Sequence, residues 1–147
     1  MAELKDICLK EIIIEQRATF KKEEKLKSRK LIEVLFKQGS SFSNFPLRVL
    51  YFFSEENISS LQAGFAVSGK HFKKAVDRNR IKRLMREAYR LQKNSLTDNL
   101  GGNKKFMAVF FIYTAKEILL YKDVSEKMKA CLQRLNKIVD EAIVANT

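Results

Sequence analysis

The chain has 147 residues, of which 46% are hydrophobic, and it carries a formal net charge of +12 with a sequence pI near 9.8. This length suits one domain, and the hydrophobic content is sufficient for a core, which excludes a globally disordered chain. The longest apolar run, Met107 to Tyr113, is too short to span a bilayer. A strongly basic domain of this kind is expected to bind an acidic polymer.

Residues 1–18 form an N-terminal extension to which we assign no role. Their apolar residues keep a partial helical spacing, which fits either a short helix packed on the domain or a loosely held arm. The domain itself is expected over residues 19–147. Cys8 and Cys131 have no metal-binding spacing with His71, and no secretory signal pattern precedes the domain. We therefore expect a cytoplasmic protein.

A helix is expected from Ser28 to Gln38. Ser28 belongs to the residue types that cap helix N-termini, and Gly39 is a typical stop. Ile32 and Phe36 are four residues apart and form an apolar pair on this helix. Such a pair on a short helix usually packs into a core.

Strands are expected in the next part of the chain. Residues 47–53 are rich in strand formers, residues 54–57 read as a turn, and residues 58–68 form one or two strands. Tyr51 and Phe65 lie within these strands. Because a slip of one residue exchanges the two faces of a strand, the sequence leaves open whether they face the helix at 28–38 or the opposite core.

The segment from Lys70 to Lys93 holds ten Lys or Arg against Asp77 and Glu87, a net +8 of the chain's +12. On a helix at about 100° per residue it divides into two arcs. The apolar arc contains Ile81, Leu84, Met85, Ala88, Tyr89 and Leu91. The opposite arc contains Asn79, Lys82, Arg83, Arg86, Arg90 and Lys93. Glu87 is expected to pair with Arg83. A solvated face normally mixes signs, so an arginine-rich arc without an acid indicates a nucleic-acid partner.

The remainder of the chain completes an α+β domain. Residues 94–103 form a polar, glycine-containing loop, residues 107–113 are apolar enough for a strand buried on both faces, and apolar spacing from Val124 to Ala142 predicts a long helix. The expected fold is a single α+β domain with the order α-β-β-β-α-β-α and a mixed sheet packed against helices.

The segment Ala75 to Tyr89, AVDRNRIKRLMREAY, resembles the RNR motif of the bacterial ribonuclease P protein family. These small basic subunits work with a catalytic RNA that removes the 5′ leader from precursor tRNA. The segments at residues 25–42, 47–53, 64–68 and 105–113 resemble the family's first helix and its strands: KLKSRKLIEVLFKQGSSF, LRVLYFF, GFAVS and KFMAVFFIY. The resemblance runs over roughly residues 20–140 and implies an unusual left-handed crossover around the basic helix.

The resemblance also implies two RNA-binding sites. Residues matched to the RNR motif would dock on the catalytic RNA: Arg78, Asn79, Arg80, Lys82, Arg83, Arg86 and Arg90. A cleft between the first helix and the sheet would hold the leader, with the candidates Ile32, Phe36, Tyr51, Phe65, Ser68 and Lys70. Many members carry an aromatic where Ile32 stands, so Phe36 is the better candidate for stacking on a base. The run from Ser68 to Lys74 is about one residue longer than in the family, with its glycine moved forward.

No catalytic motif accompanies these sites. The sequence has no phosphate-binding glycine loop, metal-binding spacing or pair of carboxylates near a histidine, which favours a binding protein. The resemblance implies that the RNA carries out hydrolysis, that the protein holds no catalytic residue, cofactor or metal, and that it lowers the Mg²⁺ requirement of the RNA-containing holoenzyme. The expected partners are the catalytic RNA and precursor tRNA, with no membrane and no DNA. A structural RNA-binding protein of ribosomal type is the alternative. A DNA-binding module ranks last, because no helix-turn-helix pattern precedes the basic helix.

Overall fold

The computed structural model describes residues 20, 22–54 and 60–145. Its elements are, in chain order, η1 (Lys22–Glu24), α2 (Arg29–Gln38), β1 (Ser40–Asn44), β2 (Leu47–Ser54), β3 (Leu61–Val67), α3 (Ala75–Gln92), α4 (Asn94–Gly102), β4 (Phe106–Tyr113) and α5 (Tyr121–Ala145). The expected N-terminal extension at residues 1–18 lies outside the described residues. Among the described residues, no helix is long and apolar enough to cross a membrane.

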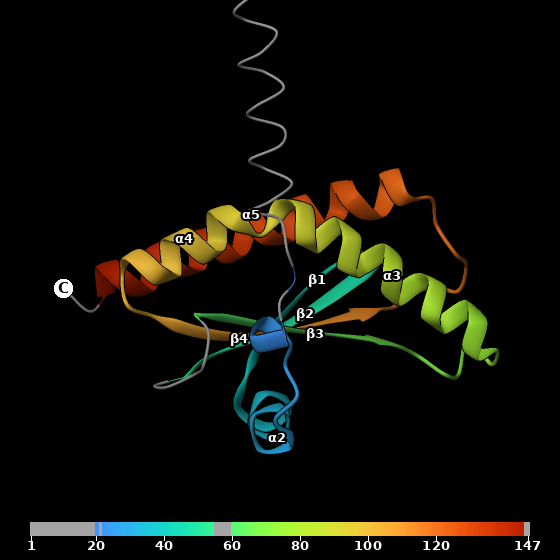
Figure 1. The fold of residues 1–147 in the computed structure, drawn as a ribbon, viewed down its shortest axis with the longest axis horizontal. Helices are drawn as coiled ribbons and strands as arrows, with labels where there is room; N and C mark the ends of the chain where they lie inside the picture. Colours follow the sequence, from blue (N-terminus) through green and yellow to red (C-terminus); the bar gives the residue numbers. More distant parts are fainter. Residues whose placement is uncertain (1–19, 21, 55–59, 146–147) are drawn as a thin grey trace, which may run out of the picture.

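The four described strands form one mixed sheet in the order β1-β2-β4-β3. β1 pairs antiparallel with β2, β2 pairs antiparallel with β4, and β3 pairs parallel with β4. Figure 1 shows α3, α4 and α5 covering one face of the sheet, while α2 lies against the other face. The predicted α+β class and mixed sheet are confirmed. β3 and β4 are parallel neighbours joined through α3 and α4, and the hand of this connection stays a prediction.

Alternation along the strands divides the hydrophobic residues between two layers. The larger one, which we call the main core, lies between the sheet and the three helices α3, α4 and α5. From β2 and β4 it receives the odd-numbered residues, such as Val49 and Phe111. The smaller one, which we call the α2 cluster, contains the even-numbered Leu50, Ala108 and Phe110 together with Leu35 of α2.

Two glycines are required by close approaches rather than by a left-handed backbone. Gly39 ends α2 with a φ of −69°, but a Cβ there would lie 2.3 Å from the carbonyl oxygen of Leu35. A Cβ on Gly64 would lie 2.7 Å from the ring of Phe110. At the other end of α2, Ser28 Oγ accepts a hydrogen bond from the Leu31 amide at 3.4 Å. The predicted start and stop of this helix are confirmed.

The structure departs from the expected elements at two places, residues 94–103 and residues 40–44. Residues 94–103 were expected as a loop, but most of them form α4, because Leu96 and Leu100 occupy one helical face and are fully buried in the main core. The expectation of one or two strands at residues 58–68 agrees with the one described strand there, β3, and residues 58 and 59 lie outside the described residues. The edge strand β1 was missed because its sequence SSFSN is polar, with Phe42 as its single core residue.

Candidate nucleic-acid interface

The basic helix α3 lies with one side in the main core. Ile81, Met85, Ala88 and Tyr89 are each 1% exposed or less, so the predicted apolar side of this helix is confirmed. The opposite side presents an exposed set of polar and cationic side chains, which we call the basic row: Asn79, Arg80, Arg83 and Arg86. Lys82 is half-buried beside the row. Because one side of α3 is buried in the main core, only the opposite side is available to a partner.

Arg78 has a structural task at the start of α3. One of its guanidinium nitrogens donates hydrogen bonds to the carbonyl oxygens of Phe72 and Lys73, both at 2.8 Å. Phe72 is itself buried and packs against Tyr113, with 6.0 Å between the ring centroids. Arg78 therefore ties the loop before α3 to the helix and presents only part of its guanidinium to a partner.

Arg90 is held by an acid on its own helix. Two of its nitrogens donate to the two carboxylate oxygens of Glu87, at 2.6 and 3.1 Å. This hydrogen bonding and the charge of Arg90 lower the pKa of Glu87, against a smaller opposing effect of burial. Glu87 was expected to pair with Arg83, and that expectation is wrong because Arg90, one turn later, takes both oxygens.

The C-terminal end of the basic segment departs from the helical-wheel prediction. Lys93 was placed on the outward arc, yet it is 2% exposed and forms an ion pair with Glu24 of η1. Lys93 is the junction residue between α3 and α4, where η1 brings the carboxylate of Glu24 to its ammonium group. Leu91, placed on the apolar arc, is 39% exposed, so this part of the prediction is wrong.

The α2 side of the sheet carries two of the residues expected at the leader site. Phe36 is 51% exposed, and its ring meets that of Phe110 edge to face at a centroid distance of 5.3 Å. Ile32 is half-buried and packs against the α2 cluster. Phe110 and its neighbour Phe52 are also only half-buried, which leaves aromatic surface beside α2 that sequence reasoning did not assign to a site.

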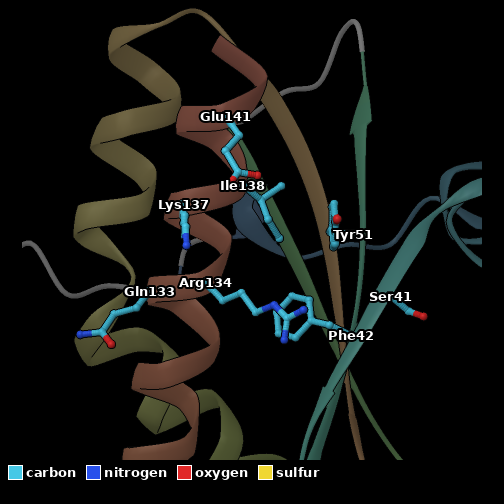
Figure 2. A pocket seen from close by; sticks show the side chains of 8 residues that line it. All are labelled: Ser41, Phe42, Tyr51, Gln133, Arg134, Lys137, Ile138 and Glu141. Atoms are coloured by element: carbon cyan, nitrogen blue, oxygen red, sulfur yellow. The ribbon is translucent and has the colours of Figure 1, made fainter. Parts of the chain in front are cut away.

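Tyr51 and Phe65 lie on the other side of the sheet. Figure 2 shows Tyr51 between the strands and α5, where a cavity of about 550 Å³ is also lined by Phe42 and Ile138. Phe65 stacks on Phe111 at 5.5 Å in the main core. The expectation that these two residues join Ile32 and Phe36 in one cleft is therefore wrong. Strand alternation sends odd and even residues to opposite faces, and the sequence did not reveal which parity faces α2.

The last two residues expected at the leader site lie in the loop between β3 and α3. The hydroxyl of Ser68 accepts a hydrogen bond from the Lys70 amide at 3.3 Å, and the Ser68 carbonyl accepts one from the Phe72 amide at 3.2 Å. Lys70 and His71 are exposed. These bonds give the lengthened loop a defined turn that ends at a buried aromatic anchor.

A family model described as Ribonuclease P matches residues 20–136, which include η1, the sheet and all of α3. The chain belongs to the ribonuclease P protein family. Membership makes it an RNA-binding protein of tRNA processing and a component of a ribonucleoprotein.

Curated relatives and solved structures agree with this placement in the ribonuclease P protein family. The ribonuclease P protein component of Porphyromonas gingivalis (strain ATCC 33277) is 35% identical over 132 residues, covering 88% of this chain and 96% of that protein. The ribonuclease P protein of Thermotoga maritima superposes with a TM-score of 0.58 at 28% identity, over 76% of this chain and 96% of the other. The Staphylococcus aureus protein has a TM-score of 0.62 at 23% identity, over 77% and 95%, which supports the shared fold.

Three titratable side chains of this ribonuclease P protein are buried in the main core: Tyr89, Tyr113 and Cys131. Burial raises the pKa of the Cys131 thiol to about 11 and that of the Tyr89 hydroxyl still higher. The Tyr113 hydroxyl donates to the Glu117 carbonyl at 2.6 Å and accepts from the Leu119 amide at 3.1 Å. The described residues contain no group of three His, Cys, Asp or Glu side chains arranged to hold a metal ion.

Proposed function

We propose that this chain is the protein subunit of a ribonuclease P and that the basic row of α3 docks on the catalytic RNA. One observation supports this most directly. Arg80, Arg83 and Arg86 are exposed on a helix whose other side is buried, and no described acid forms an ion pair with them. Like charges this close oppose helix formation, so such a row is best explained by a polyanion that neutralises it.

The second part of the proposal concerns the 5′ leader of precursor tRNA, which we assign to the α2 side of the sheet. Phe36 offers an exposed aromatic ring, and Phe52 and Phe110 extend that surface across the strands. A single-stranded leader has unstacked bases that favour such rings. Exposed Lys70 near the end of β3 supplies a cation for its phosphates, with Ser68 holding the turn.

The third part concerns chemistry and metal. We assign hydrolysis and the Mg²⁺ ions to the catalytic RNA. By neutralising RNA phosphates, the protein lowers the Mg²⁺ concentration at which the complex works, and by holding the leader it favours precursor over mature tRNA. This work takes place in the cytoplasm. None of these steps requires a catalytic side chain from the protein.

Multiple-turnover cleavage of a precursor tRNA by a bacterial ribonuclease P RNA at low Mg²⁺ tests the proposal. Cleavage that gives a mature 5′ end only when the protein is added is the expected result. The variant Arg83→Ala plus Arg86→Ala tests the basic row in the same assay, because it removes two charges and leaves the buried side of α3 intact. If the protein binds RNA but cleavage is unchanged, a structural RNA-binding role of ribosomal type replaces the proposal.

A further inference from the structure

A hollow of about 470 Å³ lies on the flank of α3, next to the basic row. Its apolar walls are Phe20, Leu84 on α3 and Tyr121, the first residue of α5. Tyr121 is 37% exposed, and Leu84 is half-buried. The hollow therefore lies where the edge of the main core reaches solvent, and its size falls within the range of small-ligand sites, about 300–1,000 Å³.

Phe20 is a fixed wall of this hollow. Its ring makes edge contacts with Phe65 and Tyr89 at centroid distances of 6.0 and 5.6 Å. The ammonium groups of Lys25 and Lys93 lie 5.9 and 5.7 Å from its centroid. Because the ring is already held on several sides, little conformational freedom is lost when a ligand packs against it. Tyr121 is the exposed ring that is available for stacking.

The rim of the hollow is charged in a pattern that suits a nucleotide. Arg83 and Arg86 stand on it as exposed cations, positioned for phosphates. Glu87 also lies on the rim, and its carboxylate is oriented by two hydrogen bonds from Arg90. A carboxylate only accepts hydrogen bonds and has lone pairs left over after binding one guanidinium. It is therefore suited to accept from the amino group of adenine, cytosine or guanine.

We infer that an unpaired, amino-bearing base of the catalytic RNA enters this hollow, stacks on Tyr121 and donates a hydrogen bond to Glu87, while Arg83 and Arg86 hold the flanking phosphates. This deepens the proposed function and rests on it. Phosphate contacts along the basic row give affinity without selecting a nucleotide, and a base contact at this position supplies the selection. The base is unpaired because side chains reach the edges and faces of bases mainly where RNA is not in a helix.

Chemical probing of the catalytic RNA tests the inference. The RNA is modified with dimethyl sulfate and with a 2′-hydroxyl acylating reagent, alone and with saturating protein. We expect one unpaired nucleotide to be protected by the wild type and by Tyr121→Phe, which keeps the ring, but to become reactive with Tyr121→Ala. Leu120→Ala is the matched control, because Leu120 is the neighbouring residue, is 75% exposed and does not line the hollow.

Binding measurements complete the test. Tyr121→Ala should weaken RNA binding by roughly 5- to 150-fold, as expected for one lost base stack, with an unchanged salt slope because no phosphate contact is lost. Replacing the protected nucleotide by uridine, which has no amino group, should weaken wild-type binding but have little further effect with Tyr121→Ala. Identical nucleotide protections and RNA affinities for Tyr121→Ala and wild type overturn the inference, while the proposed docking of the basic row on the RNA is unaffected. No RNA binding by the wild type would instead overturn the proposed function.

Discussion

Two arginines of the basic row are the residues on which RNA affinity should depend most directly. Arg83→Ala plus Arg86→Ala should weaken binding to the catalytic RNA and reduce the slope of log affinity against log salt by about one unit per lost phosphate contact. Both side chains are exposed, so stability should be nearly unchanged. A salt titration of the dissociation constant measures the effect. Arg29→Ala plus Lys30→Ala removes the same charge from the N-terminus of α2, across the sheet, and should leave the slope unchanged. Equal salt slopes for the two double variants would mean that the basic row does not contact the catalytic RNA.

Phe36 separates leader binding from core packing. Phe36→Ala should cost about 1–3 kcal/mol of binding to precursor tRNA, the usual loss for one base stack, and nothing for a substrate without a leader. The side chain is 51% exposed, so little folding free energy should be lost. Competition between substrates with and without a leader measures the difference. Phe45, 65% exposed before β2, is the matched aromatic, and Phe45→Ala should leave both affinities unchanged. Equal weakening of both substrates by Phe36→Ala would restrict Phe36 to packing.

Lys93 is a cation of the basic segment that stabilises the fold instead of contacting RNA. Lys93→Ala removes the ion pair with Glu24 from a largely buried position and should lower the free energy of unfolding by about 3 kcal/mol. The salt slope of RNA binding should stay at the wild-type value. Lys74→Ala, at an exposed position before α3, should change stability by less than about 0.5 kcal/mol. A reduced salt slope of RNA binding without a loss of stability would mean that Lys93 contacts RNA.

At the scale of elements, periodic sequences were predictable and short polar ones were not. The buried side of α3 was readable because Ile81, Met85 and Ala88 recur at helical spacing over several turns. β1 offers one core residue among serines, and α4 offers two leucines in a sequence otherwise typical of a loop. Their structure depends on partners far along the chain, β2 for the strand and α5 for the helix, which local patterns do not contain.

Helix α4 gives a direct test of that dependence. Leu100 is fully buried in the main core, so Leu100→Ala should lower the free energy of unfolding by about 2–5 kcal/mol through lost burial and a cavity. Leu91→Ala, at a 39% exposed position of α3, removes the same atoms and should cost far less. Urea denaturation of the two variants measures the contrast. Equal small losses would mean that α4 is not docked on the core.

At the scale of the molecule, the sheet separates two proposed RNA surfaces. The basic row lies on α3, and Phe36 lies on α2, with the four strands between them. The sequence predicted both helices but left the side of Tyr51 and Phe65 open, because register determines it and the hydrophobic strands are apolar on both faces. Because its strands are apolar on both faces, the sheet packs helices on each face, and each helical layer presents its own surface.

Separate surfaces should contribute independently. In an assembled complex with precursor tRNA, the free-energy cost of Arg83→Ala and that of Phe36→Ala should add to within about 0.5 kcal/mol, because α3 and α2 lie on opposite faces of the sheet. A double-mutant cycle on the affinity of the protein for the preassembled complex of catalytic RNA and precursor tRNA measures the coupling, because both surfaces contribute to that one binding constant. Arg83→Ala with Arg86→Ala, neighbours on one row, is the internal standard expected to couple more strongly. A large coupling between Arg83 and Phe36 would contradict two surfaces and indicate that one RNA segment bridges the edge of the sheet.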